Sequence, residues 1–444
     1  MNKELFVFLI LALQGVCWWF GRRSGKGLTT QSDYYLGGRS IPFFPLMMTF
    51  IATQIGGGLI LGSAEEAYSW GWWVLFYPVG QVLGLIGLST GIGKRLTNYN
   101  VSTVAQIFEV FYQSKLLKRL VSILSIFSLF LILTAQVLAS RKFMVSLSVD
   151  SDWLFFAFWG LLIAYTAIGG IKGVIATDVI QTGFFITVLL VAAGVALTAY
   201  PIAMPLESAF PATKISGWLF LPLLFTFIEQ DMGQRCFAAR SPSVLSKATF
   251  FGGITTLLIT LIPVYFGVLG NQLNVERTAG GSFLMSTVVL TTSPTLAAFV
   301  GVAVLAAILS TANSLINAIG SNLSQDFFYS RSVGSARWLS GLIGIGAVFV
   351  SYLFTNIVDL MMQAYELSVV TLLVPLLAAL FQKRTGYLPA ALLSSLSGAV
   401  GYFLFRIVPC PIPTEIAAIL LSLFGYIVSD RIAKTLSTSQ TTPI

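Results

Sequence analysis

The chain has 444 residues, of which 56% are hydrophobic and only 9% are charged, and its mean hydropathy is +0.87. Soluble domains carry about 25% charged residues, so a soluble fold is excluded and an all-helical integral membrane protein in a lipid bilayer is expected. The formal net charge of +8 does not indicate a nucleic-acid partner, because the basic residues stand singly or in pairs at the ends of apolar runs.

The side chains that most enzymes use are scarce in this sequence. Histidine is absent, which excludes histidine proton relays, most metal sites and Ser-His nucleophiles. The cysteines Cys17, Cys236 and Cys410 are widely separated and indicate neither a disulfide framework nor a metal cluster. We therefore expect neither an enzyme nor an organic cofactor.

Long apolar runs predict about thirteen membrane-spanning helices in a single domain, residues 1–444. The predicted spans are residues 4–20, 44–70, 72–92, 120–145, 153–169, 174–200, 216–234, 247–270, 296–325, 337–355, 357–381, 387–408 and 414–431. Residues 4–20 are read as an uncleaved extra helix, and residues 387–431 as two C-terminal helices. Loop lysines and arginines, with Arg235 counted among them, favour one side by about three to one, which predicts an outside N-terminus and a cytoplasmic C-terminus.

The second predicted span contains the run Gln54-Ile55-Gly56-Gly57-Gly58. Each glycine costs a helix about 1 kcal/mol relative to alanine, so the run predicts an unwound segment. Backbone leaves helical geometry at this depth only where it is buried in protein or faces a watery cavity. Its freed carbonyl oxygens would suit a hard cation. The alternative is close helix packing through small residues, and Gln54 favours the site.

The ninth predicted span carries a polar stripe. Ser310, Asn313, Ser314, Asn317 and Ser321 share one helical face by their spacing. A polar face inside a membrane protein must turn toward a cavity or another helix. Hydrogen bonding between helices is the alternative, but five polar positions favour a lined site.

A glycine turn separates the fifth and sixth predicted spans, in the segment Tyr165–Gln181. Asp178 follows in the first turns of the next helix. Two explanations are equally good for this residue: it interacts with the helix dipole, or it lies on the path by which a cation leaves toward the cytoplasm.

At these positions the chain resembles the sodium/solute symporter family, which includes transporters for proline, sugars, pantothenate and sialic acid. The resemblance runs in order through Asp33–Arg39, Tyr165–Gln181, Gln234–Ala239 and Ala306–Ser314. It implies the inverted-repeat fold of the leucine-transporter type, with two five-helix halves and a broken first helix in each. The repeats would cover residues of about 44–200 and 216–381.

The resemblance also implies a sodium site. Its ligands would be the backbone carbonyls of Ala52, Ile55 and Ala307 and the hydroxyls of Ser310 and Thr311. These last three residues also share a helical face by spacing alone.

Some members of the family have a second cation site, which Asp178 and Ser314 match in this chain. Asn313 stands where those members have a hydroxyl, which puts a second ion in doubt. Asp178 would otherwise serve only the exit of sodium.

Positions that would contact the solute follow from the same resemblance. The candidates are Gln54, Thr53, Gly56, Tyr77, Gln136, Phe225, Thr226 and Gln230. Glu65 and Glu66, in the outer half of the second span, indicate a cation-attracting vestibule or a buried ion pair. Arg141 could attract an anionic solute or extend to the membrane interface.

The expected function is sodium-coupled symport, by alternating access, of a small polar organic solute such as an amino acid, a sugar, sialic acid or a carboxylate. Sodium would be the co-transported ion. The protein is expected to act as a monomer in a bacterial inner membrane. The alternatives are a proton-coupled carrier of the same fold and a membrane sensor that does not transport.

Overall fold

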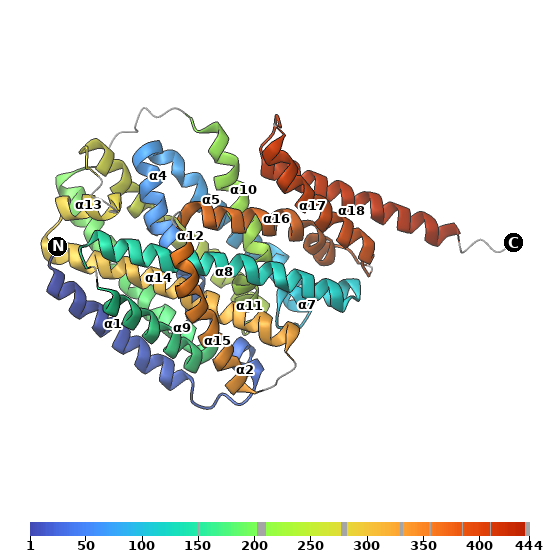
Figure 1. The fold of residues 1–444 in the computed structure, drawn as a ribbon, viewed down its shortest axis with the longest axis horizontal. Coiled ribbons are helices and arrows are strands. Elements are labelled where there is room, and N and C mark those ends of the chain that lie inside the picture. The colour runs from blue at the N-terminus through green and yellow to red at the C-terminus, as the bar shows by residue number, and fades with distance from the viewer. Residues whose placement is uncertain are drawn as a thin grey trace.

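The computed structural model describes residues 1–149, 151–201, 210–276, 282–328, 332–354, 357–383, 385–408 and 410–439. These residues form a bundle of helices with short connections, and Ile41 and Ala239 make the isolated β-bridge found among them (Figure 1). The α-helices in chain order are α1 (Lys3–Ser24), α2 (Gln31–Leu36), α3 (Phe43–Gln54), α4 (Ser63–Trp70), α5 (Phe76–Gly87), α6 (Gly93–Asn98), α7 (Val104–Tyr112), α8 (Lys115–Ser146), α9 (Asp152–Ala199), α10 (Ala212–Ile228), α11 (Gln230–Ala238), α12 (Pro242–Gln272), α13 (Phe283–Thr291), α14 (Pro294–Asn322), α15 (Val333–Val350), α16 (Ile357–Phe381), α17 (Leu388–Ile407) and α18 (Thr414–Ser439).

Nine helical segments within the described residues are long and apolar enough to cross a membrane, and α3 and α10 are shorter apolar helices. The predicted count of thirteen is not confirmed. Two of the four missing spans are lost because residues 58–98 and 152–199 each run on as one helical segment where we predicted separate spans. The predicted spans 216–234 and 414–431 are not among the nine, the first because its helix is short. The many apolar helices make the chain a multi-pass membrane protein.

The predicted turn between residues 169 and 174 is a kink inside α9. Gly170 has φ +56°, a conformation that glycine adopts at no steric cost. A Cβ at this position would lie 2.7 Å from the carbonyl oxygen of Tyr34. The hydroxyl of Tyr34 donates to the carbonyl of Ala167, 2.8 Å away, so α2 packs directly against the kink.

The predicted break in the second span is confirmed. Helix α3 ends at Gln54, and helical geometry resumes in a π-helical turn, η2 (Gly58–Gly62), that leads into α4. A Cβ on Gly56 would lie 2.6 Å from Oγ1 of Thr311, so α14 approaches the unwound backbone too closely for a side chain there.

A second break separates α10 from α11. Glu229 between them is extended, with φ −67° and ψ 126°. Pro222 inside α10 already weakens the helix before this point. The predicted span 216–234 is therefore two helices. Arg235, which we counted with the loop charges, is fully buried inside α11 and has to be removed from that count. Arg277, Arg331 and Arg384, also part of the count, lie outside the described residues.

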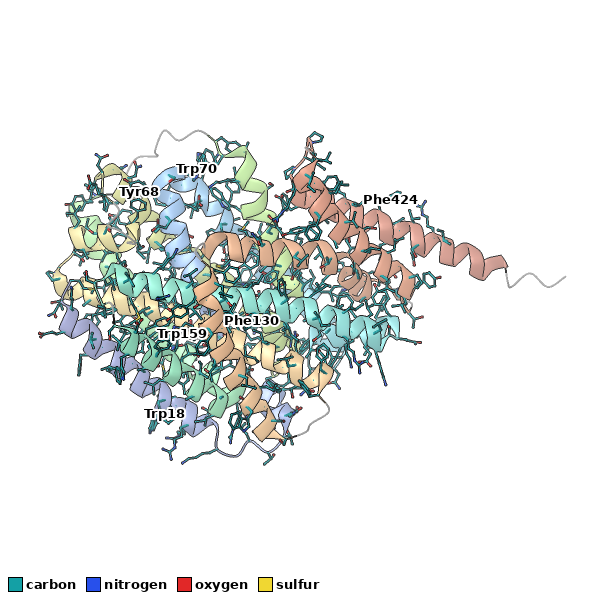
Figure 2. All side chains as sticks on the ribbon, in the orientation of Figure 1. Trp18, Tyr68, Trp70, Phe130, Trp159 and Phe424 are labelled. Carbon is teal, nitrogen blue, oxygen red and sulfur yellow. The ribbon has the colours of Figure 1, made fainter. Side chains whose placement is uncertain are left out.

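Helix α14 forms the centre of the bundle, and every residue from Val300 to Asn322 is buried. It packs against α8, α9, α3 and α15. Figure 2 shows Trp159 inside the bundle, whereas Phe424 points outward from α18. Large apolar side chains such as Trp153 and Leu353 are more than three-quarters exposed, as expected for a surface that faces hydrocarbon.

The peripheral helices attach differently at the two ends of the chain. Helix α1 lies along α9, where Gly21 sits directly over Tyr165 and Gly169. Small residues at such a crossing let two backbones approach closely. Helices α17 and α18 pack against each other and against α16, and α18 extends away from the rest of the bundle (Figure 1).

Candidate functional site

Four predicted sodium ligands converge where α14 passes the end of α3. The hydroxyl of Ser310 donates to the carbonyls of Ala52 and Ala307, at 3.1 and 2.9 Å. The hydroxyl of Thr311 lies 3.2 Å from the carbonyl of Ala52 and 3.3 Å from that of Ala307. Carbonyl and hydroxyl oxygens gathered in a buried place form the ligand set that a hard cation takes. Ile55, the fifth predicted ligand, directly follows the last residue of α3 and has left helical geometry, with φ −91° and ψ 79°.

The unwound segment is held from α8. The backbone N–H of Gly57 donates to Oε1 of Gln136, 2.9 Å away. An amide N–H freed by the break would otherwise be buried without a partner, at a cost of about 1–3 kcal/mol. Gln136 therefore supports the break in addition to lining the cavity beside it.

Arg235 lies between Asp178 and Ser314, which were predicted as ligands of a second cation. Its Nη2 donates to Oγ of Ser314 at 2.5 Å and lies 3.5 Å from Oδ2 of Asp178. Its Nε donates to the hydroxyl of Thr49, which in turn donates to Asp178. Arg235 and Asp178 are fully buried, so the pair exists away from solvent. The guanidinium of Arg235 thus occupies the position that was predicted for a second sodium ion.

Asn313 faces a different helix. Its Oδ1 accepts a hydrogen bond from Thr166 at 2.7 Å, and its amide donates to the hydroxyl of Tyr165 at 3.2 Å. Both partners belong to α9, so this amide joins α14 to α9. Of the predicted stripe, Ser314 contacts Arg235, whereas Asn317 accepts from the amide of Gln234.

A cavity lies beside the sodium ligands, with about 460 Å³ of space between its lining atoms, part of which is open to solvent. Its lining residues are Thr53, Gln54, Gly56, Gly58, Leu59, Tyr77, Gln81, Ile132, Gln136, Pro222, Phe225, Thr226, Glu229, Thr311, Leu315, Met361 and Tyr365. Seven of the eight predicted solute-contacting residues are in this set. Thr311 lines the cavity and also belongs to the sodium ligands, which brings the two sites into contact.

The eighth, Gln230, lies elsewhere. Its Oε1 accepts from the backbone N–H of Val104 at 2.7 Å, and its amide donates to the carbonyl of Ser102. Gln230 therefore anchors the start of α7. Because Glu229 is extended, the side chains before and after the break face different partners. Helical spacing alone does not predict this.

Sequence reasoning missed Glu229, Gln81 and Tyr365 as lining residues, and it missed the fully buried Asp231 close to them. A signal for the two acids was present, because Glu229 and Asp231 lie inside an apolar run, where carboxylates are rare and functional. Tyr365 and Gln81 are ordinary residues of their helices, and no sequence pattern distinguishes them.

The outer acids make separate interactions. Glu66 forms an ion pair of 2.8 Å with Lys214, and both side chains are partly exposed. Glu65 accepts a hydrogen bond from the backbone N–H of Phe283 at 3.0 Å. The guanidinium of Arg141 lies 4.0 Å above the ring of Tyr352.

Known proteins share this architecture and parts of the sequence. The sequence model of the sodium:solute symporter family matches residues 34–204. A human high affinity choline transporter is 24% identical over 86% of this chain and 72% of its own length. A sodium/pantothenate symporter of Haemophilus influenzae is 25% identical over 71% of this chain and 69% of its own.

Two solved structures have the same fold. A Na⁺-coupled sialic acid symporter in a substrate-bound outward-open state superposes with a TM-score of 0.78 and 16% identity, covering 97% of both chains. Mhp1, a nucleobase-cation-symport-1 family transporter in a closed conformation, superposes with a TM-score of 0.63 and 15% identity, covering 90% of this chain and 94% of its own.

These two structures share the fold of this chain, so the predicted all-helical, inverted-repeat fold class is confirmed apart from the helix count. The chain matches the sodium:solute symporter family over residues 34–204, as its motifs predicted. It is a transporter that couples a small solute to sodium, and not an enzyme.

Proposed function

We propose that one sodium ion binds between the end of α3 and α14, and that it creates the form of the protein that binds solute. The observation that carries this proposal is the convergence of the Ala52 and Ala307 carbonyls with the hydroxyls of Ser310 and Thr311. Thr311 also lines the solute cavity. A bound ion would fix the distance between the broken helix and α14, and this distance sets one wall of the cavity. Coupling then follows from the better binding of sodium to the solute-competent state.

The second cation position is filled by the protein in this proposal. The Arg235 guanidinium neutralises Asp178 and occupies the hydroxyl of Ser314. A second sodium would have to displace a buried, hydrogen-bonded charge, which leaves an unpaired ion and is strongly unfavourable. We therefore favour one sodium per cycle. Asp178 would accept the departing ion only if Arg235 moves away.

The path for solute runs along α4. A second hollow, lined by Gly62, Glu66 and Trp218, shares Gly58, Tyr77, Met361 and Tyr365 with the central cavity. In our proposal this hollow faces outward.

The orientation in the membrane follows the same proposal. The protein lies in the inner membrane of a bacterial cell, with its N-terminus outside and its C-terminus in the cytoplasm. The repeats comprise residues of about 44–200 and 216–381, and the protein acts as a monomer. The relatives carry solutes as different as choline, pantothenate and glucose, so their names alone support only a small polar solute.

Purified protein in proteoliposomes tests this function. An inward sodium gradient at constant pH should drive uptake of a solute, and replacement of sodium by potassium should abolish it. A plot of uptake rate against sodium concentration should be hyperbolic for one ion. Uptake that follows a proton gradient without sodium would show the proton-coupled carrier instead, and solute binding without any flux would show the sensor.

A further inference from the structure

The central cavity carries an acidic group at the second helix break, and the charge of this group bears on the class of solute. Glu229 lines the cavity, and Asp231 lies two residues further on, fully buried at the start of α11. A cation bound beside a buried carboxyl group favours the ionised form of that group.

No lysine or arginine forms an ion pair with Glu229 or Asp231 among the described residues, and the cavity lining contains no basic side chain. The hydrogen bonds of the Arg235 guanidinium go to Asp178, Thr49, Ser314 and the backbone carbonyl of Asp231. Within the described part of the chain Oδ2 of Asp231 has no hydrogen-bond partner, while Oδ1 accepts from the N–H of Met232.

Aromatic rings line the same cavity. Phe225 lies one helical turn before Glu229, whose backbone N–H donates to the Phe225 carbonyl, and its ring centroid is 4.5 Å from that of Tyr365 at an angle of 39°. Tyr77 lines the cavity together with Phe225 and Tyr365. Faces of aromatic rings attract cations, and several rings together are the usual receptor for alkylated ammonium groups.

From this combination we propose that the transported solute is a small organic cation, an alkylammonium compound whose charged nitrogen sits between Glu229 and the rings of Phe225, Tyr77 and Tyr365. The amides of Gln54 and Gln136 then hold a polar group at its other end. A carboxylate solute would meet a buried acidic group and no basic side chain in the cavity lining, so this proposal disfavours acids. This inference rests on the proposed sodium-coupled transport and adds the class of solute to it.

Two measurements test this proposal: sodium-driven uptake of each probe into proteoliposomes, and thermal stabilisation of the purified protein by each probe. Both are made in about 100 mM sodium, close to physiological ionic strength. The probes are choline and tetramethylammonium as cations, 3,3-dimethylbutan-1-ol as the uncharged analogue of choline, glucose as a neutral solute and pantothenate as an acid. We expect both cations to bind. The affinity for choline should be roughly tenfold or more higher than the affinity for its uncharged analogue.

Variants at two positions, Glu229 and Tyr365, test where the cation binds. Glu229→Gln should weaken choline binding by roughly tenfold or more and leave the binding of 3,3-dimethylbutan-1-ol unchanged. Tyr365→Phe keeps the ring and should retain choline binding, whereas Tyr365→Leu should lose it. Glu109→Gln is the matched control, because this acid pairs with Lys118 away from the cavity.

Different results would contradict the organic-cation proposal and the sodium-symport proposal. Sodium-driven uptake of glucose or pantothenate in place of the cations would overturn the organic-cation proposal and leave the symporter proposal intact. Equal binding of choline by the wild type and by folded Glu229→Gln protein would also overturn it. Absence of stabilisation by sodium, together with absence of sodium-driven uptake of every probe, would overturn the symporter proposal itself.

Discussion

Nη2 of Arg235 donates a hydrogen bond of 2.5 Å to the hydroxyl of Ser314. The Ser314 hydroxyl donates in turn to the carbonyl of Ser310, one of the residues that gather at the end of α3. A buried charge on α11 is therefore joined to the proposed sodium site through the side chain of Ser314 and the backbone carbonyl of Ser310, both on α14. A change at Arg235 should be felt at the sodium site, because Ser314 and the site residues Ser310 and Thr311 belong to the same helix.

Removal of a site hydroxyl should weaken sodium binding. Ser310→Ala and Thr311→Ala each delete an oxygen that lies near the carbonyl of Ala52. We expect the sodium concentration for half-maximal uptake to rise roughly tenfold, which corresponds to about 1.4 kcal/mol. Uptake at varied sodium concentration measures the effect. Thr198→Ala, at an exposed hydroxyl near the end of α9, should change nothing. Wild-type sodium dependence in both site variants would refute the assignment.

Breaking the buried ion pair should destabilise the fold. Arg235→Gln leaves the carboxylate of Asp178 buried without its cation, and this typically costs about 3–5 kcal/mol. The thermal midpoint in detergent should fall sharply. The double variant Asp178→Leu/Arg235→Met removes both charges and should regain most of the loss. If the double variant were no more stable than Arg235→Gln, the pair would not be the source of the effect.

The support of Gln136 for the unwound segment can be tested by a pair of substitutions. Gln136→Leu leaves the N–H of Gly57 without an acceptor, at a cost of about 1–3 kcal/mol. Gln136→Glu keeps an acceptor oxygen and should retain more uptake activity than the leucine variant. Sodium-dependent uptake of the two proteins, each normalised to folded protein, gives the comparison. Equal activity would show that the hydrogen bond does not hold the break.

The kink of α9 should tolerate no side chain. Gly170→Ala places a Cβ in the left-handed region, at a cost of about 1–2 kcal/mol before the clash with Tyr34 is added. The control is Gly160→Ala in the same helix, where a Cβ meets nothing within 4 Å. That change should be neutral or stabilising by up to about 1 kcal/mol. Thermal melting of both variants decides, and an equal response of the two would contradict a special role for Gly170.

The parts of the structure that sequence could predict are those in which composition interrupts a regular pattern. Glycines inside an apolar run indicated the break after Gln54, because they weaken a helix. Non-helical backbone occurs at membrane depth only where it is buried in protein or faces water. The spacing of Ser310 and Ser314 placed them on one face of a buried helix. Both signals are local, so a single sequence contains them.

The missed parts depend on tertiary structure. Arg235 was read as a loop cation because it follows an apolar run, but its partners Asp178, Thr49 and Ser314 come from three other helices. Gln230 was assigned to the cavity by its position, yet the extended Glu229 turns it toward α7. Neither outcome follows from helical periodicity, which ends at the break.

The close crossing of Gly21 over Gly169 has a mechanical consequence for transport. A hypothetical Cβ on Gly169 would lie 3.0 Å from the carbonyl oxygen of Gly21, so the two backbones touch without intervening side chains. Such a contact leaves no room for sliding between α1 and α9. The extra N-terminal helix should therefore travel with α9 as one rigid body when access alternates, and a cross-link between the two helices at this crossing should leave turnover intact.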